Sequence, residues 1–402
     1  MYMRIYCCFA LIPLLLQNVL ASERSVTSDR YNAEINFVEG NAVEANISLE
    51  AGMVDNFLNA NNDKQNTAYF QVAPDLILQA QSHNDLFQLG IQTEFIKFND
   101  FSDDDHNDYS LMTKYHHKFS NDHKVFITGS SVNYYEYRGT GVTLGDAESI
   151  DVGDEISTYF VNGGYMYGND TSVGRFKILY GKRSSEYDTR RSVTNVLDLT
   201  SSYIQGEVDY LISGKSFITT NIQYEDIEQD NNSEQDRTLL SGLLGVKWES
   251  SALTKLSILL GYQEADFDHS SFSNSTDFIW STSLLWSPLD STTIDINTSR
   301  SFTDSKKITN TLSTVTTYGV KLNYAFNDVT KFYSRLSFDS EEFTSESTRI
   351  TEDFFKASFG INYQWKTRYS FYLRYDFNDF ESDIVSNNYE KNSLALGFSA
   401  SI

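Results

Sequence analysis

The sequence predicts an all-β fold: a transmembrane, antiparallel, up-and-down β-barrel of about 18 strands, with 16 as the alternative count. Three observations favour this fold. Apolar and polar residues alternate over segments of about 11 to 15 residues, short and long connections alternate along the chain, and the chain ends inside such a segment. Soluble strands usually have about 5 or 6 residues and membrane strands about 9 to 11 plus extensions. Strand length therefore disfavours the alternatives, a soluble β-sandwich or a secreted solenoid.

The first 21 residues are predicted to be a secretory signal peptide. Arg4 precedes an apolar run, Ile5 to Leu16, and a small-residue cleavage signal ends at Ala21. The run is shorter than the roughly 20 apolar residues that a spanning helix needs, which disfavours a membrane anchor. Residues 22–44 show no clear period and are expected to be a periplasmic lead-in, so that residues 45–402 form the barrel.

Composition limits the function. The 402 residues include 31 Lys and Arg against 55 Asp and Glu, a net charge of −24; loss of Arg4 with the leader leaves 30 against 55, or −25. Nucleic acid is not an expected partner, because phosphate binding needs the opposite sign. Cys7 and Cys8 both lie in the leader, so we expect no disulfide in the exported part. The 28 Phe, 26 Tyr and only three Pro suit strands.

Period-two alternation is clearest near the C-terminus. From Phe355 to Trp365 apolar and polar residues alternate, Lys366–Arg368 is predicted to be a short turn, and the final alternating segment ends at Ile402. The same pattern, followed towards the N-terminus, gives strands at about 45–57, 67–81, 85–99, 107–118, 123–137, 155–167, 172–186, 198–211, 215–228, 237–249, 252–267, 276–287, 291–303, 315–326, 331–344, 353–365, 369–381 and 389–402.

Short turns and longer, acidic, Ser/Asn-rich connections alternate between these strands, as periplasmic turns and outer loops do in membrane barrels. Hydrocarbon offers no hydrogen-bond partner, so the last strand should pair with the first, near Ile47–Leu49. Pro74 interrupts the second strand and removes one ladder donor, so we expect a bulge or an irregular end there. Aromatic residues beside the short turns predict an interfacial girdle: Trp248, Trp286, Trp365, Tyr324 and Phe326.

The strand faces opposite the apolar ones should line an aqueous channel, because about eighteen strands enclose a lumen. The candidate lumen-lining residues carry both charge signs, with basic residues grouped on the C-terminal strands. They are Gln88, Gln92, Glu94, Arg175, Lys177, Gln205, Glu207, Asp209, Lys321, Arg335, Lys356, Arg374 and Asp376. The alternative is that these residues only keep the lumen wet and form salt bridges with one another.

The third long connection, Arg138 to Asp154, is rich in Gly, Asp and Glu. By analogy with general porins, a loop at this place could fold inward as an acidic constriction formed by Arg138, Asp146, Glu148, Asp151, Asp154 and Glu155. A solvated surface loop is the alternative. The run Asp103–Asp105 is expected to be solvated, with divalent cation binding at a lipopolysaccharide surface as the other interpretation.

Catalysis is not predicted. The histidines are His83, His106, His116, His117, His123 and His269, and most lie in predicted turns or loops. No nucleophile or metal-ligand motif accompanies them, so we predict no catalytic residue, no metal site and no cofactor.

Four segments resemble the putative beta-barrel porin 2 family: Val54–Phe57, Pro74–Leu78, Phe98–Asp108 and Tyr134–Gly141. The resemblance covers most of the mature chain in strand layout and is specific around Arg138-Gly139. Members of this family are outer-membrane barrels often associated with exopolysaccharide or capsule clusters. The resemblance implies passage of polysaccharide across the outer membrane, and none of its motifs carries a catalytic residue.

Three functions are therefore open: a channel for exopolysaccharide export, a general or sugar-selective diffusion porin, and a structural or adhesive barrel without transport. The predicted location is the bacterial outer membrane. The expected partners are outer-membrane lipid and lipopolysaccharide, together with polysaccharide and export-machinery proteins if export is the function.

Overall fold

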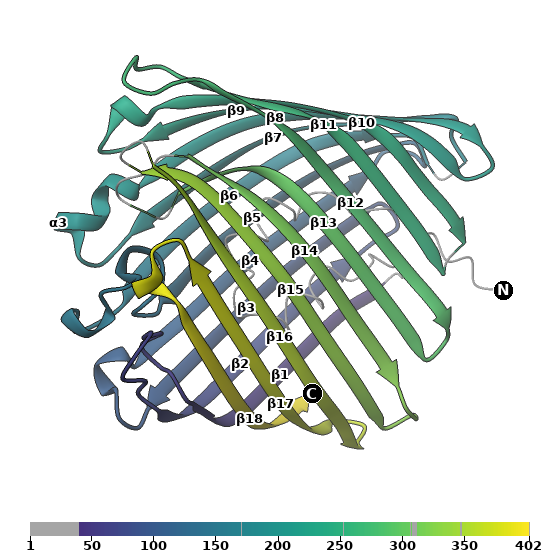
Figure 1. Ribbon diagram of the computed structural model, residues 1–402. Coiled ribbons are helices and arrows are strands. Elements are labelled where there is room, and N and C mark those ends of the chain that lie inside the picture. Colours follow the sequence, from purple (N-terminus) through teal and green to yellow (C-terminus); the bar gives the residue numbers. More distant parts are fainter. Residues whose placement is uncertain are drawn as a thin grey trace.

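One closed antiparallel sheet forms the molecule. The computed structural model describes residues 40–169, 171–251, 253–305, 307, 312–345 and 348–401; the predicted signal peptide and most of the predicted lead-in lie outside these residues. Each of the 18 strands pairs with the next along the chain, and β18 pairs with β1. Figure 1 shows the tilted strands closing into a barrel. The predicted fold class and the count of 18 are confirmed.

The strands are β1 (Gly40–Val54), β2 (Thr67–Gln81), β3 (Asp85–Phe98), β4 (His106–Lys118), β5 (His123–Glu136), β6 (Asp154–Tyr167), β7 (Gly174–Tyr187), β8 (Leu199–Ser213), β9 (Ser216–Gln229), β10 (Arg237–Ser251), β11 (Thr254–Phe267), β12 (Ser275–Leu289), β13 (Thr292–Asp304), β14 (Leu312–Ala325), β15 (Thr330–Ser345), β16 (Thr348–Lys366), β17 (Tyr369–Ser382) and β18 (Tyr389–Ser401). The first strand begins at Gly40, five residues before the predicted start at residue 45. The other boundaries lie within a few residues of the predicted ones, except that β16 starts five residues early, at Thr348.

Closure occurs where the sequence predicts it. Ile47 lies opposite Ala400 and Leu49 opposite Phe398 in the ladder between β1 and β18. Pro74 leaves a gap in the ladder between β2 and β3, which is paired at Val72 and again at Asp75 in an unchanged register. The proline therefore removes ladder bonds without inserting a bulge.

The two ends of the barrel differ. Short turns gather at one end, where β1 begins at Gly40 and β18 ends at Ser401; this is the short-turn end. The other, the long-loop end, carries short helical turns: η1 (Ser102–Asp104), η2 (Gly141–Thr143), η3 (Ala147–Ser149), α3 (Arg191–Thr194), η4 (Asn195–Leu197), η5 (Ser233–Gln235) and η6 (Val385–Asn387). Among the residues that the structure describes, no helix is long and apolar enough to cross a membrane.

The outer face is apolar. Large apolar side chains such as Ile127 and Leu244 are 54% and 59% exposed at alternate positions in mid-strand, the pattern of a wall that faces lipid. All five aromatic residues of the predicted girdle are exposed beside short turns: Trp248, Trp286, Trp365, Tyr324 and Phe326. The buried apolar residues lie on the other side of the wall or under the loops, because a barrel of this size has no central core.

Candidate functional site: the lumen and its long-loop mouth

The inner face of the wall is the candidate functional site. On β3 the exposed Phe87, Ile91 and Phe95 face outward, so the residues between them face the lumen. By the same alternation the structure places on the inner face every predicted lining residue: Gln88, Gln92, Glu94, Arg175, Lys177, Gln205, Glu207, Asp209, Lys321, Arg335, Lys356, Arg374 and Asp376. Whether they line a conducting path stays a prediction.

A first charged cluster lies near the short-turn end of β7, β8 and β10. Arg175 donates from Nη2 to Asp209 Oδ2 at 3.0 Å and to Glu249 Oε1 at 3.3 Å. Lys247 Nζ lies 2.7 Å from Glu207 Oε1 and 3.2 Å from Asp209 Oδ1. The predicted lining residues Arg175, Glu207 and Asp209 are thus each paired with a side chain of opposite charge, and they do not form a field of one sign.

A second charged cluster closes the seam between the first and last strands. Glu50 of β1 accepts hydrogen bonds from the hydroxyls of Tyr69 at 2.7 Å and Tyr372 at 2.8 Å, and from Arg374 Nη2 at 2.9 Å. Arg374 also donates from Nε to Asp376 Oδ2 at 2.8 Å. Glu50 is 4% exposed. A buried carboxylate with three donors joins β2, β1 and β17 across the seam.

The remaining predicted lining residues lie beside other inward side chains, on the same strand or on strands nearby. Gln92 donates to Glu94 at 2.8 Å, and Lys356 lies 3.7 Å from Asp339. Lys177 Nζ lies 5.3 Å from the centre of the Phe126 ring. Lys321 is opposite Arg335 in the ladder between β14 and β15. Two amides on β3 and β8 face other amides, Gln88 opposite Gln79 and Gln205 opposite Gln223.

Four inward tyrosine rings lie flat against glycines of the neighbouring strand. A Cβ on Gly397 would lie 2.0 Å from Tyr372 Cζ and 2.4 Å from both Cε1 and the hydroxyl oxygen, so it would meet the ring from its face. The same close approach occurs in three other pairs: Tyr69 on Gly52, Tyr203 on Gly181 and Tyr333 on Gly360. The rings are half-buried, with one face on the glycine backbone. Only glycine admits this packing.

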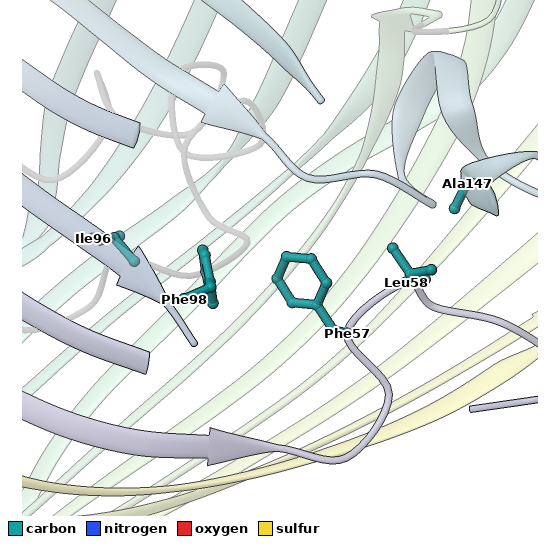
Figure 2. Packing of buried hydrophobic residues seen from close by; sticks show 5 residues of the cluster. All are labelled: Phe57, Leu58, Ile96, Phe98 and Ala147. Atoms are coloured by element: carbon teal, nitrogen blue, oxygen red, sulfur yellow. The ribbon is translucent and has the colours of Figure 1, made fainter. Parts of the chain in front are cut away.

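Loops from three hairpins pack together at the long-loop end. Phe57 and Leu58, after β1, and Ala147, in the loop after β5, form one buried cluster with Ile96 and Phe98 of β3 (Figure 2). Ile96 and Phe98 alternate with the outward-facing residues of β3, so these loops rest on the inner side of the wall. The loop after β5 therefore leans over the mouth of the barrel.

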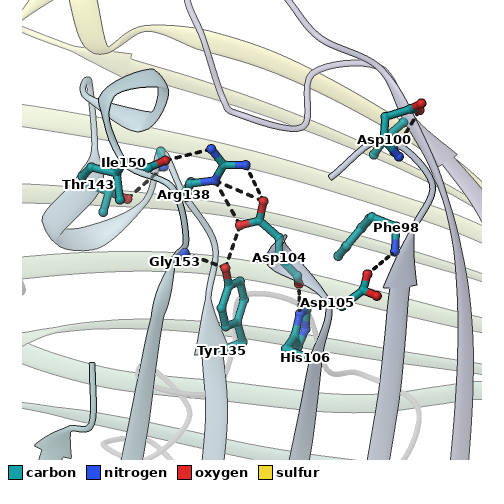
Figure 3. A network of polar contacts seen from close by, with 12 residues as sticks. Phe98, Asp100, Asp104, Asp105, His106, Tyr135, Arg138, Thr143, Ile150 and Gly153 are labelled. Atoms are coloured by element: carbon teal, nitrogen blue, oxygen red, sulfur yellow. Dashed lines mark hydrogen bonds and ion pairs between the residues drawn. The ribbon is translucent and has the colours of Figure 1, made fainter. Parts of the chain in front are cut away.

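Arg138 fixes the base of this loop. Its guanidinium pairs with Asp104, which is fully buried, and donates from Nη1 to the Ile150 carbonyl at 2.8 Å (Figure 3). Tyr135 donates its hydroxyl to Asp104 Oδ1 at 2.6 Å and accepts from the Gly153 N–H at 2.5 Å. The expectation that Asp103–Asp105 is a solvated run is wrong for Asp104, because Arg138 and Tyr135 bury it.

The predicted constriction residues separate into two groups. Arg138 and Asp154 are buried, and Asp154 is paired with Arg190 of the next long loop, so both hold loops together. The other four are exposed: Asp146, Glu148, Asp151 and Glu155. An acidic constriction formed by this second group stays a prediction.

Several inward residues were missed by the sequence analysis. Glu50, at the seam, lies in an alternating strand and gives the same local signal as any other inward carboxylate. Arg183, Arg237 and Asp304 come from β7, β10 and β13 and meet only in the folded barrel. Alternation could have placed Arg183 and Arg237 on the inner face, but the position of Asp304 depends on a distortion of β13.

Histidines and carboxylates form no metal site among the described residues: no group of three or more His, Cys, Asp or Glu side chains is placed to hold an ion. His116 stacks on Phe126, and His117 Nδ1 lies 2.7 Å from Asp85 Oδ1 on the other face of the strand. These histidines have ordinary packing and pairing partners.

Several solved structures are similar to this one. They include the siderophore receptor PirA from Acinetobacter baumannii (8% identity, 92% of this chain and 82% of that chain, TM-score 0.47) and Acinetobacter baumannii OccAB3 (10%, 90% and 99%, TM-score 0.46). PirA from Pseudomonas aeruginosa is also similar (9%, 92% and 82%, TM-score 0.44). No curated protein matches the chain.

A family model described as Putative beta-barrel porin 2 matches residues 40–401, from the first residue of β1 to the last of β18. The matched range coincides with the closed barrel, with its apolar outer face and its charged and tyrosine-lined inner face. The chain belongs to the putative beta-barrel porin 2 family and is an outer-membrane β-barrel channel.

Proposed function

We propose that this barrel passes exopolysaccharide outward across the outer membrane, as the family resemblance implies. The observation that carries the proposal is the set of tyrosine rings laid flat on glycines of the inner wall. A ring held against backbone on one side presents its other face to the lumen. Sugar rings have an apolar C–H face that contacts such a surface and hydroxyls that bond nearby polar groups, and tyrosine offers both an apolar body and a polar tip.

The short-turn end offers the matching polar groups. Tyr333 borders a groove there whose lining is mostly amide and hydroxyl, including Asn323, Asn362, Gln364 and Ser370, with Asp290 and Lys331 as its charged residues. In an outer-membrane barrel the short turns face the periplasm, where an exported polymer would enter. Uncharged donors and acceptors next to an aromatic ring suit a neutral or weakly charged sugar chain better than a small ion.

The net charge does not oppose this function. Inner carboxylates such as Glu50, Glu207 and Asp209 are paired with arginine or lysine. At the long-loop end of β9, by contrast, Asp226, Glu228 and Asp230 are exposed. Acidic residues in excess of the basic ones are therefore found at the exposed outer rim, while Glu50, Glu207 and Asp209 along the inner wall are paired with basic side chains. A polymer inside the barrel then meets a nearly neutral surface.

The deciding experiment is deletion of the gene, with extracellular and periplasmic polysaccharide measured against the parent strain. We expect less polymer outside the cell and accumulation or stalled synthesis within. Complementation with Tyr333→Ala should restore export only partly and Tyr333→Phe fully, because phenylalanine keeps the ring. Tyr318→Ala, on the exposed outer face, is the matched control. Unchanged polymer after deletion would refute the proposal.

A diffusion porin is the second candidate, and the ion pairs of both signs along the inner wall favour it. In that case deletion would leave polymer unchanged but slow the uptake of small solutes. Solute uptake by whole cells and conductance of the purified barrel would then show measurable permeation.

A further inference from the structure

The tip of the β13–β14 hairpin separates from the barrel wall. β13 pairs with β12 only as far as Arg300, and β14 pairs with β15 only from Thr314 onward. Beyond these points Thr303 and Asp304 still pair with Ser313 and Leu312. The hairpin tip, residues 301–304 with 312–313, is thus a two-stranded arm that has left both neighbours in the sheet.

The tip points into the lumen, as Phe302 shows. Ile296 lies on the outer face and is 39% exposed, and Phe302 has the same parity, so a regular strand would turn it outward. Instead Phe302 is 3% exposed and its N–H donates to Gln263 Oε1, an inward side chain of β11, at 2.9 Å. Its buried neighbours come from β9, β10 and β11: Ile227, Leu239 and Ala265.

Charged side chains hold the tip against the inner face of the wall at β7 and β10. Asp304 Oδ2 accepts from Arg183 Nη2 at 2.7 Å, and Asp304 also pairs with Arg237, which is 1% exposed. Arg183 is on β7, six steps round the sheet from β13, or roughly 29 Å of wall at about 4.8 Å per step. A direct ion pair over that separation means that the hairpin crosses part of the lumen.

Two further ion pairs support this arrangement at its base. Arg300 lies where the tip leaves the wall and donates from Nη2 to Asp277 of β12 at 2.7 Å and to Glu342 of β15 at 3.2 Å. It thereby bridges the two strands that the tip has left. Beyond the tip, Lys307 pairs with Glu352 of β16. The tip is therefore fixed on both sides.

We propose that the hairpin tip is a gate inside the lumen at the long-loop end, held shut by Asp304 on Arg183 and Arg237. In the closed state Phe302 packs on the wall formed by β9, β10 and β11. Release of Asp304 lets the arm swing back towards β12 and β15 and widens the passage. The gate is a property of the barrel itself and goes beyond the proposed export of polysaccharide.

Conductance of the purified full-length barrel in planar bilayers tests the gate. Asp304→Asn keeps the shape and removes the charge, and Asp304→Arg places a third positive charge beside two arginines. We expect the open fraction to rise at least about tenfold in Asp304→Arg and less in Asp304→Asn, since removing one partner of a buried ion pair strongly destabilises the paired state. Asp75→Asn and Asp75→Arg are matched controls, because Asp75 faces the lumen on β2, away from the tip.

Thiol reactivity tests the movement directly. Cys7 and Cys8 precede the predicted cleavage site, so Phe302→Cys should carry the only thiol of the exported barrel. A water-soluble maleimide should label it slowly in the parent background and at least about tenfold faster with Asp304→Asn. Ser281→Cys, inward on β12, should react equally in both backgrounds.

Heat-modifiable gel mobility would establish that each variant forms a closed barrel. If Asp304→Arg does not assemble, the conductance of Asp304→Asn alone tests the gate. Parent-like conductance of Asp304→Asn, together with slow labelling of the Phe302→Cys thiol in that background, would overturn the gate. So would a conductance change that the Asp75 variants reproduce, because lumen charge alone would then explain it. Neither result would bear on polymer export, which the deletion strain measures separately.

Discussion

Gly397→Ala should strongly destabilise the barrel at its seam. Gly397 of β18 lies under the ring of Tyr372, and a Cβ there would lie 2.0 Å from Cζ. The ring must move away, and its hydroxyl then leaves Glu50 Oε2, to which it donates at 2.8 Å. Overpacking costs about 1 to 3 kcal/mol, and loss of a hydrogen bond to a charged group costs about 1.5 to 3 kcal/mol. We therefore expect a loss of about 3 to 5 kcal/mol in the free energy of unfolding.

The assay is urea unfolding of the barrel in lipid vesicles, followed by tryptophan fluorescence. Gly206→Ala is the matched control, because Gly206 is also a strand glycine but a Cβ there would meet nothing within 4 Å. Its free energy of unfolding should change by less than about 1 kcal/mol, the usual gain of alanine over glycine. The double variant Gly397→Ala with Tyr372→Ala should recover the part of the loss that comes from overpacking.

Two results would refute this reasoning. Gly397→Ala could prove as stable as Gly206→Ala, which would mean that the ring at Tyr372 adjusts without cost. Alternatively, the double variant could lose more free energy of unfolding than the two single variants lose together, which would mean that the ring and the added Cβ do not clash.

Two further predictions concern the loops and the lipid face. Arg138→Ala leaves Asp104 buried without its cation, at a cost of about 3 to 5 kcal/mol. Limited proteolysis should therefore cut the loops 99–105 and 137–153, while the barrel keeps its heat-modifiable gel mobility. Loops that stay uncut would contradict the anchoring role of Arg138. Leu244→Arg places a charge at mid-strand on the exposed outer face and should lower the free energy of unfolding in urea by about 2 to 4 kcal/mol. Gln205→Arg, on the inner face, should not destabilise the barrel in this way. Equal effects of the two variants would contradict the assignment of faces.

The wall of the barrel could be predicted from the sequence because alternation is a local signal. Each strand reveals its two faces through period two, and an even number of strands with alternating short and long connections then leads to closure. The pairing of Ile47 with Ala400 follows from the rule that hydrocarbon tolerates no open edge. The aromatic girdle follows from its position beside short turns.

The contacts that organise the lumen could not be predicted in the same way. Asp104 belongs to a run of three aspartates that resembles a solvated loop, and only Arg138, 34 residues later in the chain, makes it a buried anchor. The inward position of Phe302 could not be predicted for a different reason. Its place in the alternation is that of an outward residue, and the separation of the hairpin from the sheet turns its side chain inward. Alternation assigns faces correctly only while a strand stays in the sheet.

The charges of this protein act through their arrangement more than through their sum. Arg175 and Arg374 lie among the predicted lining residues, which carry both charge signs, and carboxylates compensate both. Asp209 on the adjacent strand pairs with Arg175, and Glu50 on β1 and Asp376 on the same strand pair with Arg374. Such pairs connect strands that are adjacent or one strand apart, and they hold the shape of the wall. The pair of Asp304 with Arg183 differs, because it links two parts of the wall that lie six strands apart in the sheet. A change of charge at Asp304 should therefore alter the width of the passage, whereas the same change at Asp75 should alter only the local field.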